Sequence, residues 1–120
     1  MNGTASDTFI FQINQGNFAL SGDTHIVLTG GLTPNNILWD FQGSGGQVQT
    51  SGNSFTQGIF LAPNEGIQIN GGIHYSEFIS GVSMSFQSNP VINQIPEPST
   101  LALLVSTGLI LVGLRKRFVR

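Results

Sequence analysis

The chain has 120 residues, of which only 8% are charged and none is cysteine. This composition excludes a disulfide framework, a cysteine-ligated metal site and a thiol nucleophile. All the basic residues lie within Arg115–Arg120, so the body of the chain carries only acidic charges. A body without cations cannot neutralise phosphates, which excludes nucleic acid as a partner and a lysine-containing nucleotide loop.

Short apolar runs of strand length fill residues 1–88, and breakers rich in Gly, Pro and Asn separate them. No window of eleven or more residues has helical periodicity, so the body is predicted to be all-β. The predicted strands are Phe9–Ile13, Phe18–Leu20, Ile26–Leu28, Ile37–Phe41, Ile59–Leu61, Ile67–Ile69 and Val82–Phe86.

Three segments of the body resemble one another, each an alternating strand between breakers: Gly16–Gly22, Gly45–Gly52 and Asn64–Gly71. Each segment follows a more apolar strand, and the pairs recur at spacings of about 20 to 29 residues, the size of one coil of a repeat protein. This pattern favours a three-sided β-solenoid of short coils that share one interior. A β-sandwich or meander with ordinary turns remains the alternative.

An uncharged run follows at residues 99–114, ending in the apolar stretch Leu101–Leu114. As a helix it would be roughly 24 Å long at about 1.5 Å per residue, somewhat short for a hydrocarbon core of about 30 Å. Arg115, Lys116 and Arg117 follow directly, as expected for a cytoplasmic stop signal. We expect one C-terminal transmembrane α-helix in the inner membrane with a basic end at 115–120; a buried core helix, which would need a polar face, is the alternative.

Pro96 and Pro98 flank Glu97 just before this run. Each proline disfavours helix in the residue before it, so the segment is predicted to be extended and accessible to a processing enzyme. The simpler interpretation is a linker that stops the helix. Residues 89–95 are expected to link this segment to the β domain at residues 1–88.

The order of these elements in residues 96–120 resembles the PEP-CTERM sorting signal: Pro96-Glu97-Pro98, an apolar helix and Arg115-Lys116-Arg117. The resemblance implies export from a Gram-negative bacterium, with an inner-membrane intermediate that is released to the cell surface or extracellular matrix. It further implies that an exosortase recognises Pro96, Glu97 and Pro98 and removes or replaces the tail.

The body is similar to the choice-of-anchor A domain in Asn36–Phe41, Gly58–Asn64 and Ile69–Ile73. Phe9–Ile13 and Ile26–Gly31 also resemble the last coils of ice-binding-like β-solenoids. These families imply an extracellular domain on a surface anchor. Because Met1–Thr4 lacks the basic and apolar regions of a signal peptide, we expect the sequence to be the C-terminal part of a longer domain.

Several polar residues were considered as a catalytic or metal site. Asp23 and His25 are two positions apart and could share a strand face, but His25 and His74 are expected to be ordinary polar residues at a turn and a strand start. Asp40 and Glu65 could form the carboxylate pair of a glycoside hydrolase. Alternation turns Asp40 away from Trp39, so we expect no catalytic residue, no bound metal and no cofactor.

The sequence therefore predicts a non-enzymatic surface or matrix structural protein. Its expected partners are the exosortase, the inner membrane and extracellular polysaccharide. The competing hypothesis is a binding module for glycan, adhesion or ice on the same anchor. The threonines of the body form no evident Thr-x-Thr ladder of the kind that ice binding commonly uses.

Overall fold

The computed structural model describes residues 1–93 and residue 95. The strands in this part of the chain are β1 Phe9–Ile13, β2 Phe18–Leu20, β3 Ile37–Phe41, β4 Gln47–Thr50, β5 Phe55–Ala62, β6 Gly66–Asn70, β7 Ile73–Ser80, β8 Met84–Gln87 and β9 Val91–Asn93, with one 3₁₀ turn, η1 Pro34–Asn36.

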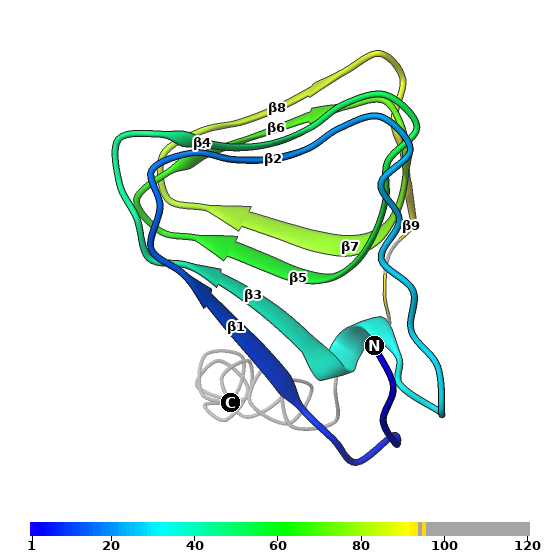
Figure 1. Cartoon of the computed structure of the whole chain (residues 1–120). Coiled ribbons are helices and arrows are strands. Elements are labelled where there is room, and N and C mark those ends of the chain that lie inside the picture. The colour runs from blue at the N-terminus through cyan, green and yellow to red at the C-terminus, as the bar shows by residue number, and fades with distance from the viewer. Residues whose placement is uncertain (94, 96–120) are drawn as a thin grey trace, which may run out of the picture.

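Strands of odd and even number form two separate sheets, both entirely parallel. The orders are β1-β3-β5-β7-β9 and β2-β4-β6-β8. Because each strand pairs with the strand two positions later, the chain winds as a solenoid, making three turns between β2 and β8 (Figure 1). This confirms the β-solenoid and excludes the sandwich. The similarity of the three repeated segments is confirmed as well, since β2, β4 and β6 stack in register.

A third side of the solenoid is built from short pieces of the odd-numbered sheet. His25 forms a parallel bridge with Phe55, which lies in register with Ile73, and Ile73 lies in register with Val91. The starts of β5 and β7, together with β9, therefore stack on the segment around His25, at the right of Figure 1. We call this the third side, β2-β4-β6-β8 the second side, and β1, β3 and the ends of β5 and β7 the first side.

β5 passes from the third side to the first side without interruption. Its alternation of inward and outward side chains continues over all eight residues. Gly58, with φ +121°, is the residue at which the direction changes, and a Cβ there would lie 2.8 Å from Trp39 Nε1. The indole N–H of Trp39 instead donates to the Gln57 carbonyl at 3.0 Å. Glycine is thus required at position 58 for two reasons: the positive φ of the backbone and the lack of room for a Cβ.

The first turn is longer than the turns that follow. Register partners are 28 residues apart from Phe9 to Ile37, but only 18 apart from Phe55 to Ile73. The additional residues lie before β3 and contact the N-terminal segment. The side-chain amide of Asn36 in η1 donates to the carbonyls of Ala5 at 3.0 Å and Asp7 at 2.7 Å, and Asn2 forms a parallel bridge with Thr29.

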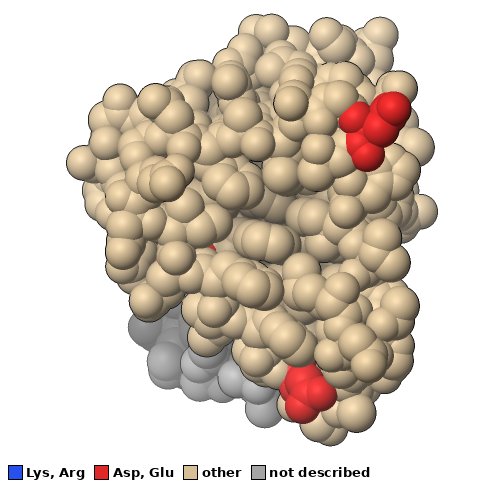
Figure 2. Space-filling view, in the orientation of Figure 1, with Lys and Arg blue, Asp and Glu red and all other residues tan. Residues whose placement is uncertain are grey.

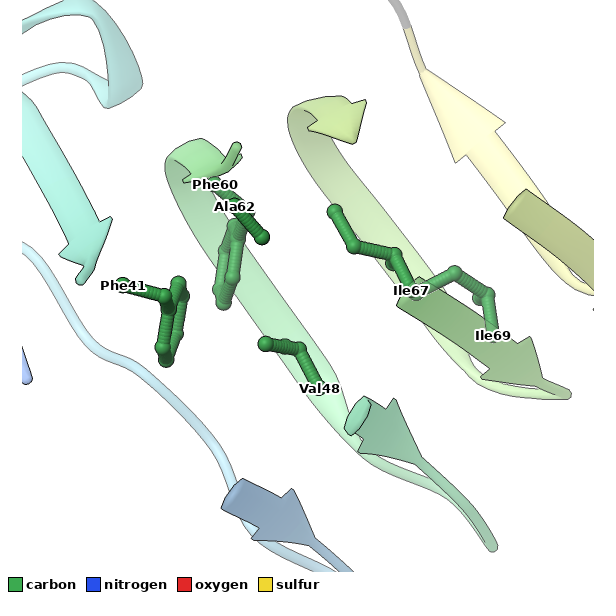
Figure 3. Close-up of a cluster of buried hydrophobic side chains, with 6 residues drawn as sticks. All are labelled: Phe41, Val48, Phe60, Ala62, Ile67 and Ile69. Carbon is green, nitrogen blue, oxygen red and sulfur yellow. The ribbon is translucent and has the colours of Figure 1, made fainter. Parts of the chain in front are cut away.

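The centre of the solenoid is filled by side chains from its first and second sides. Figure 3 shows the buried cluster of Phe41, Val48, Phe60, Ala62, Ile67 and Ile69. An aromatic row runs beside it along the first side, with ring centroids 4.7 Å apart for Phe11 and Trp39 and 5.7 Å apart for Trp39 and Phe60. Stacked coils keep like side chains in register, so aromatic residues add pairwise contacts to their burial.

The solenoid extends past the expected boundary at residue 88. β9 lies inside the segment predicted as a linker and pairs with β7. Among residues 1–93 and 95, no helix is long and apolar enough to cross a membrane. The membrane helix predicted at residues 99–114 lies outside the described residues.

Candidate functional site

The outer surface of the third side is apolar and aromatic. Val27, Ile73, Tyr75 and Val91 are exposed on it. The ring of Phe55 contacts the ring of Tyr75, with centroids 5.7 Å apart and planes inclined at 57°. Large apolar side chains exposed together on one face are typical of interaction surfaces.

A shallow pocket of about 400 Å³ opens on this side, lined by His25, Asn53, Ser54, Phe55, Gly72 and Ile73. The imidazole of His25 lies against the Phe55 ring at a centroid distance of 5.8 Å. Gly72 also lines the pocket, with φ +82°, and a Cβ there would come within 2.4 Å of the Ser54 carbonyl oxygen and 3.0 Å of His74 Nε2. A side chain at Gly72 would therefore clash with the backbone of Ser54 and with the buried imidazole.

Ser54 provides an unused polar group at the pocket. Its side chain is fully buried, and its hydroxyl has no hydrogen-bond partner among the described residues. A buried hydroxyl without a partner costs free energy. Because this side chain is fully buried, a ligand in the pocket does not reach its hydroxyl in this structure.

A buried polar network lies beneath the third side. His74 Nε2 is 2.8 Å from the Gly71 carbonyl oxygen, and Thr56 Oγ1 is 2.8 Å from His74 Nδ1 and 2.7 Å from Ser76 Oγ. The carbonyl can only accept, so the neutral imidazole donates from Nε2 and accepts from Thr56 at Nδ1. Burial lowers the pKa of His74, and its hydrogen bond to Gly71 opposes this more weakly.

The surface around the pocket carries little charge. No Asp, Glu, Lys or Arg side chain lines the pocket. In the view of Figure 2 no basic residue is visible on the described surface, and the acidic residues form isolated spots. The pocket and the exposed apolar residues beside it therefore suit an uncharged ligand better than an anion.

The two histidines considered from the sequence have different environments. His25 is exposed at the pocket, as expected for a polar residue near a turn. His74 lies at the start of β7, as expected, but its side chain is fully buried. His74 is the second residue of β7, and the strand alternation points it inward.

Asp40 and Glu65 do not share a surface. Asp40 faces outward on the first side, where Gln42 donates to its carboxylate at 3.0 Å. Glu65 is buried at the corner between β5 and β6, and its carboxylate oxygens have no hydrogen-bond partner among the described residues. Burial raises the pKa of Glu65. The arrangement offers no carboxylate pair facing a common cleft.

The remaining predicted sites are not tested by this structure. Pro96, Glu97 and Pro98, and the basic residues Arg115, Lys116 and Arg117, lie outside the described residues. Within residues 1–93 and 95, no group of three or more His, Asp or Glu side chains could hold a metal ion.

The residues of the third side could not be identified as one face from the sequence. Phe55, Ile73 and Tyr75 lie outside every strand predicted from the sequence, whereas the structure has them in β5 and β7. The signal that could have found them is their register: Phe55 and Ile73 are 18 residues apart and align once the coil length is known.

A comparison with curated proteins finds no match. A family model described as ice-binding-like matches residues 1–85, which is more than half of the chain. The fold and this match agree with the resemblance seen in the body. The chain belongs to the ice-binding-like family.

Proposed function

We propose that this protein is an exported, non-enzymatic binding module that holds a neutral extracellular polysaccharide on its third side. In this proposal the PEP-CTERM tail displays the module, and an exosortase processes that tail at Pro96-Glu97-Pro98. The family match supports a surface-displayed binding role, and the sequence of the tail supports the route.

The observation that carries the proposal is the uncharged aromatic surface of Phe55 and Tyr75 beside the pocket. Sugar rings present C–H faces that pack on aromatic rings, and hydroxyl rims that require hydrogen-bond partners. The exposed residue Asn53, which carries a side-chain amide, lines the same pocket. An apolar floor with a few polar groups is the usual composition of a small-molecule site.

Ice is the second candidate ligand, because the family match favours it. The environments of the threonines in the described chain do not fit an exposed threonine array for ice. Thr50 and Thr56 are buried, and the hydroxyls of Thr24 and Thr29 donate to the carbonyls of Ser21 and Met1. The apolar third side therefore suits a glycan better than a regular lattice of surface hydroxyls.

The test uses the full chain, solubilised in a mild detergent, and its binding to dextran, a soluble uncharged β-glucan and alginate. We expect binding to at least one neutral polymer and weaker binding to anionic alginate. Tyr75→Ala and Phe55→Ala should each weaken binding about tenfold or more, because aromatic anchors contribute about 2 kcal/mol or more when truncated.

Ile79→Ala is the matched control, since Ile79 is similarly exposed but lies on the first side. It should leave binding unchanged. Thermal hysteresis with no glycan binding would replace this proposal with ice binding. Equal losses in the Tyr75→Ala and Ile79→Ala variants would show that the third side is not the site.

A further inference from the structure

Aromatic rings on the third side are arranged across successive coils. His25, Phe55 and Tyr75 belong to three consecutive turns of the chain. The ring centroids of His25 and Phe55 are 5.8 Å apart, and those of Phe55 and Tyr75 are 5.7 Å apart. The two steps are nearly equal, so these three rings form one continuous row across the coils. We call this row the aromatic track.

Backbone hydrogen bonds hold the coils of the aromatic track together. The Phe55 N–H donates to the Thr24 carbonyl at 2.8 Å, and the Ile26 N–H donates to the Phe55 carbonyl at 2.9 Å. The Ile73 N–H donates to the Ser54 carbonyl at 3.0 Å. The rings therefore stand on a parallel ladder of strands, and a ligand that stacks on them does not have to order a loop.

The outward side chains change character along each single strand. Phe55 is followed on β5 by Gln57, whose side-chain amide donates to the Ile26 carbonyl at 2.9 Å. Tyr75 is followed on β7 by the exposed carboxylate of Glu77. A ligand that lay along one strand would meet one aromatic ring and then a polar or charged group. A ligand that lay across the coils would meet all three rings.

We propose that the aromatic track binds an extended, cellulose-type neutral glycan that runs along the solenoid axis, with successive sugar rings on His25, Phe55 and Tyr75. This inference rests on the proposed function and adds the linkage class and the direction of the ligand. Equatorial linkages keep the rings of such a glycan in one flat ribbon, so their C–H faces can stack on side chains fixed in a row. A flexible coil such as dextran has to be straightened first, which costs conformational entropy.

The pocket lies beside the aromatic track and supplies its polar edge. His25, Phe55 and the exposed Asn53 line this pocket, and no Asp, Glu, Lys or Arg side chain of the described chain does. The hydroxyl groups at the rim of a stacked sugar ring need polar partners of this uncharged kind. An anionic polymer gains no ion pair at the same place.

The test measures the affinity of the full chain for cellulose-type oligosaccharides of increasing length, by titration calorimetry in a detergent without a sugar headgroup. Affinity should rise roughly fivefold with each ring up to the trisaccharide and then level off, because the aromatic track offers three stacking positions. The trisaccharide derived from dextran has the same number of rings and should bind about tenfold more weakly.

Two variants test the direction of the ligand. His25→Ala removes one end of the aromatic track and should lower the affinity for the cellulose-type trisaccharide roughly fivefold, whereas the disaccharide, which stacks on Phe55 and Tyr75, should lose less than about twofold. Glu77→Gln is the control, since Glu77 is the next outward residue along β7. It should leave both affinities unchanged.

A loss of affinity in Glu77→Gln with none in His25→Ala would show that the ligand runs along β7 and would overturn the proposed direction. So would an affinity that stays constant from the disaccharide to the tetrasaccharide. Equal binding of the two trisaccharides would overturn the linkage class and leave the proposed function standing. Absence of binding to every neutral polymer and oligosaccharide would remove the proposed function and this inference together.

Discussion

The buried imidazole of His74 shows how one residue can link stability to pH. It stands in a chain of hydrogen bonds in which Gly71 accepts from it and Thr56 donates to it. In the neutral ring both nitrogens have a hydrogen-bond partner. A second proton would bind at Nδ1 and would have to displace the hydrogen that Thr56 donates there. Protonation would place a charge in the interior with no carboxylate among its hydrogen-bond partners, which is costly.

This arrangement predicts a loss of stability at mildly acidic pH. The folded pKa of His74 is lowered from 6.5, so its contribution is fully present above that value and is lost as pH falls below it. Thermal melts between pH 7.5 and 5 should show a decreasing Tm, at roughly 4–8 °C for each kcal/mol lost. His74→Gln should lower Tm at pH 7.5 and flatten this decrease. His25→Gln changes an exposed histidine and should leave the decrease of Tm as it is in the wild type. An unchanged decrease of Tm in His74→Gln would contradict the assignment of this effect to His74.

Glu65 titrates in the opposite direction. Burial raises its folded pKa above 4.5, so the neutral acid favours the folded state and that contribution is lost as pH rises through the folded pKa. Comparing each histidine variant with wild type at every pH separates the two effects. The burial of Glu65 was not predicted because this residue lies between β5 and β6, where the two-residue alternation of strands gives no prediction.

At the scale of elements, the corners between strands are set by close approach of neighbouring coils. Gly46 lies at the corner between β3 and β4, and a Cβ there would lie 1.1 Å from the Gly16 carbonyl oxygen of the previous coil. Gly45 beside it has φ +79° and open space around it. The two adjacent glycines are therefore required for different reasons, one for contact between coils and one for backbone conformation.

The corner predicts unequal effects of two neighbouring substitutions. Gly45→Ala should cost about 1 kcal/mol, because an L-residue is strained in the left-handed region. Gly46→Ala should cost about 3 kcal/mol or more, because the backbone of the first coil must move. Urea unfolding measures both, and equal costs for the two variants would show that the coils are spaced more widely than the structure has them.

Much of the element order could be predicted because two sides repeat visibly in the sequence. The apolar runs of β1 and β3 and the alternating segments of β2, β4 and β6 correspond to the repeats identified there. The third side was missed because β5 and β7 turn the corner with their alternation intact. Gly58 in β5 is the one Gly or Pro residue within these two strands, and its sequence context does not distinguish it from an ordinary glycine in a strand.

The third side also defines the candidate site, so the site could not be predicted before the register was known. Ile26–Leu28 was predicted as a strand, but the structure has only two isolated bridges beside this segment, His25 to Phe55 and Asn2 to Thr29. The aromatic residues of the site come from two different turns of the chain. The two-residue alternation of a strand predicts that a residue faces outward, but it does not predict which residue of the next coil lies beside it.

At the scale of the whole molecule, the proposed route depends on the tail and is independent of the third side. Glu97→Ala, in a full chain provided with a signal peptide in an exporting host, should prevent processing and leave the intact chain in the inner membrane. Ser99→Ala is the matched control and should be processed as wild type. Mass and cell fractionation measure both, and loss of the tail in the Glu97→Ala protein would contradict recognition of that carboxylate.

The equal spacing of register partners along the third side has a consequence for how such genes can change in length. Phe55 and Ile73 occupy equivalent positions 18 residues apart, and Ile73 and Val91 are again 18 apart. An in-frame deletion of residues 55–72 would join Ser54 to Ile73 and leave every remaining row aligned. Duplication of the same segment would add a turn. Lineages can therefore lengthen or shorten the third side by whole coils, and each step would change the number of ligand contacts without a new fold.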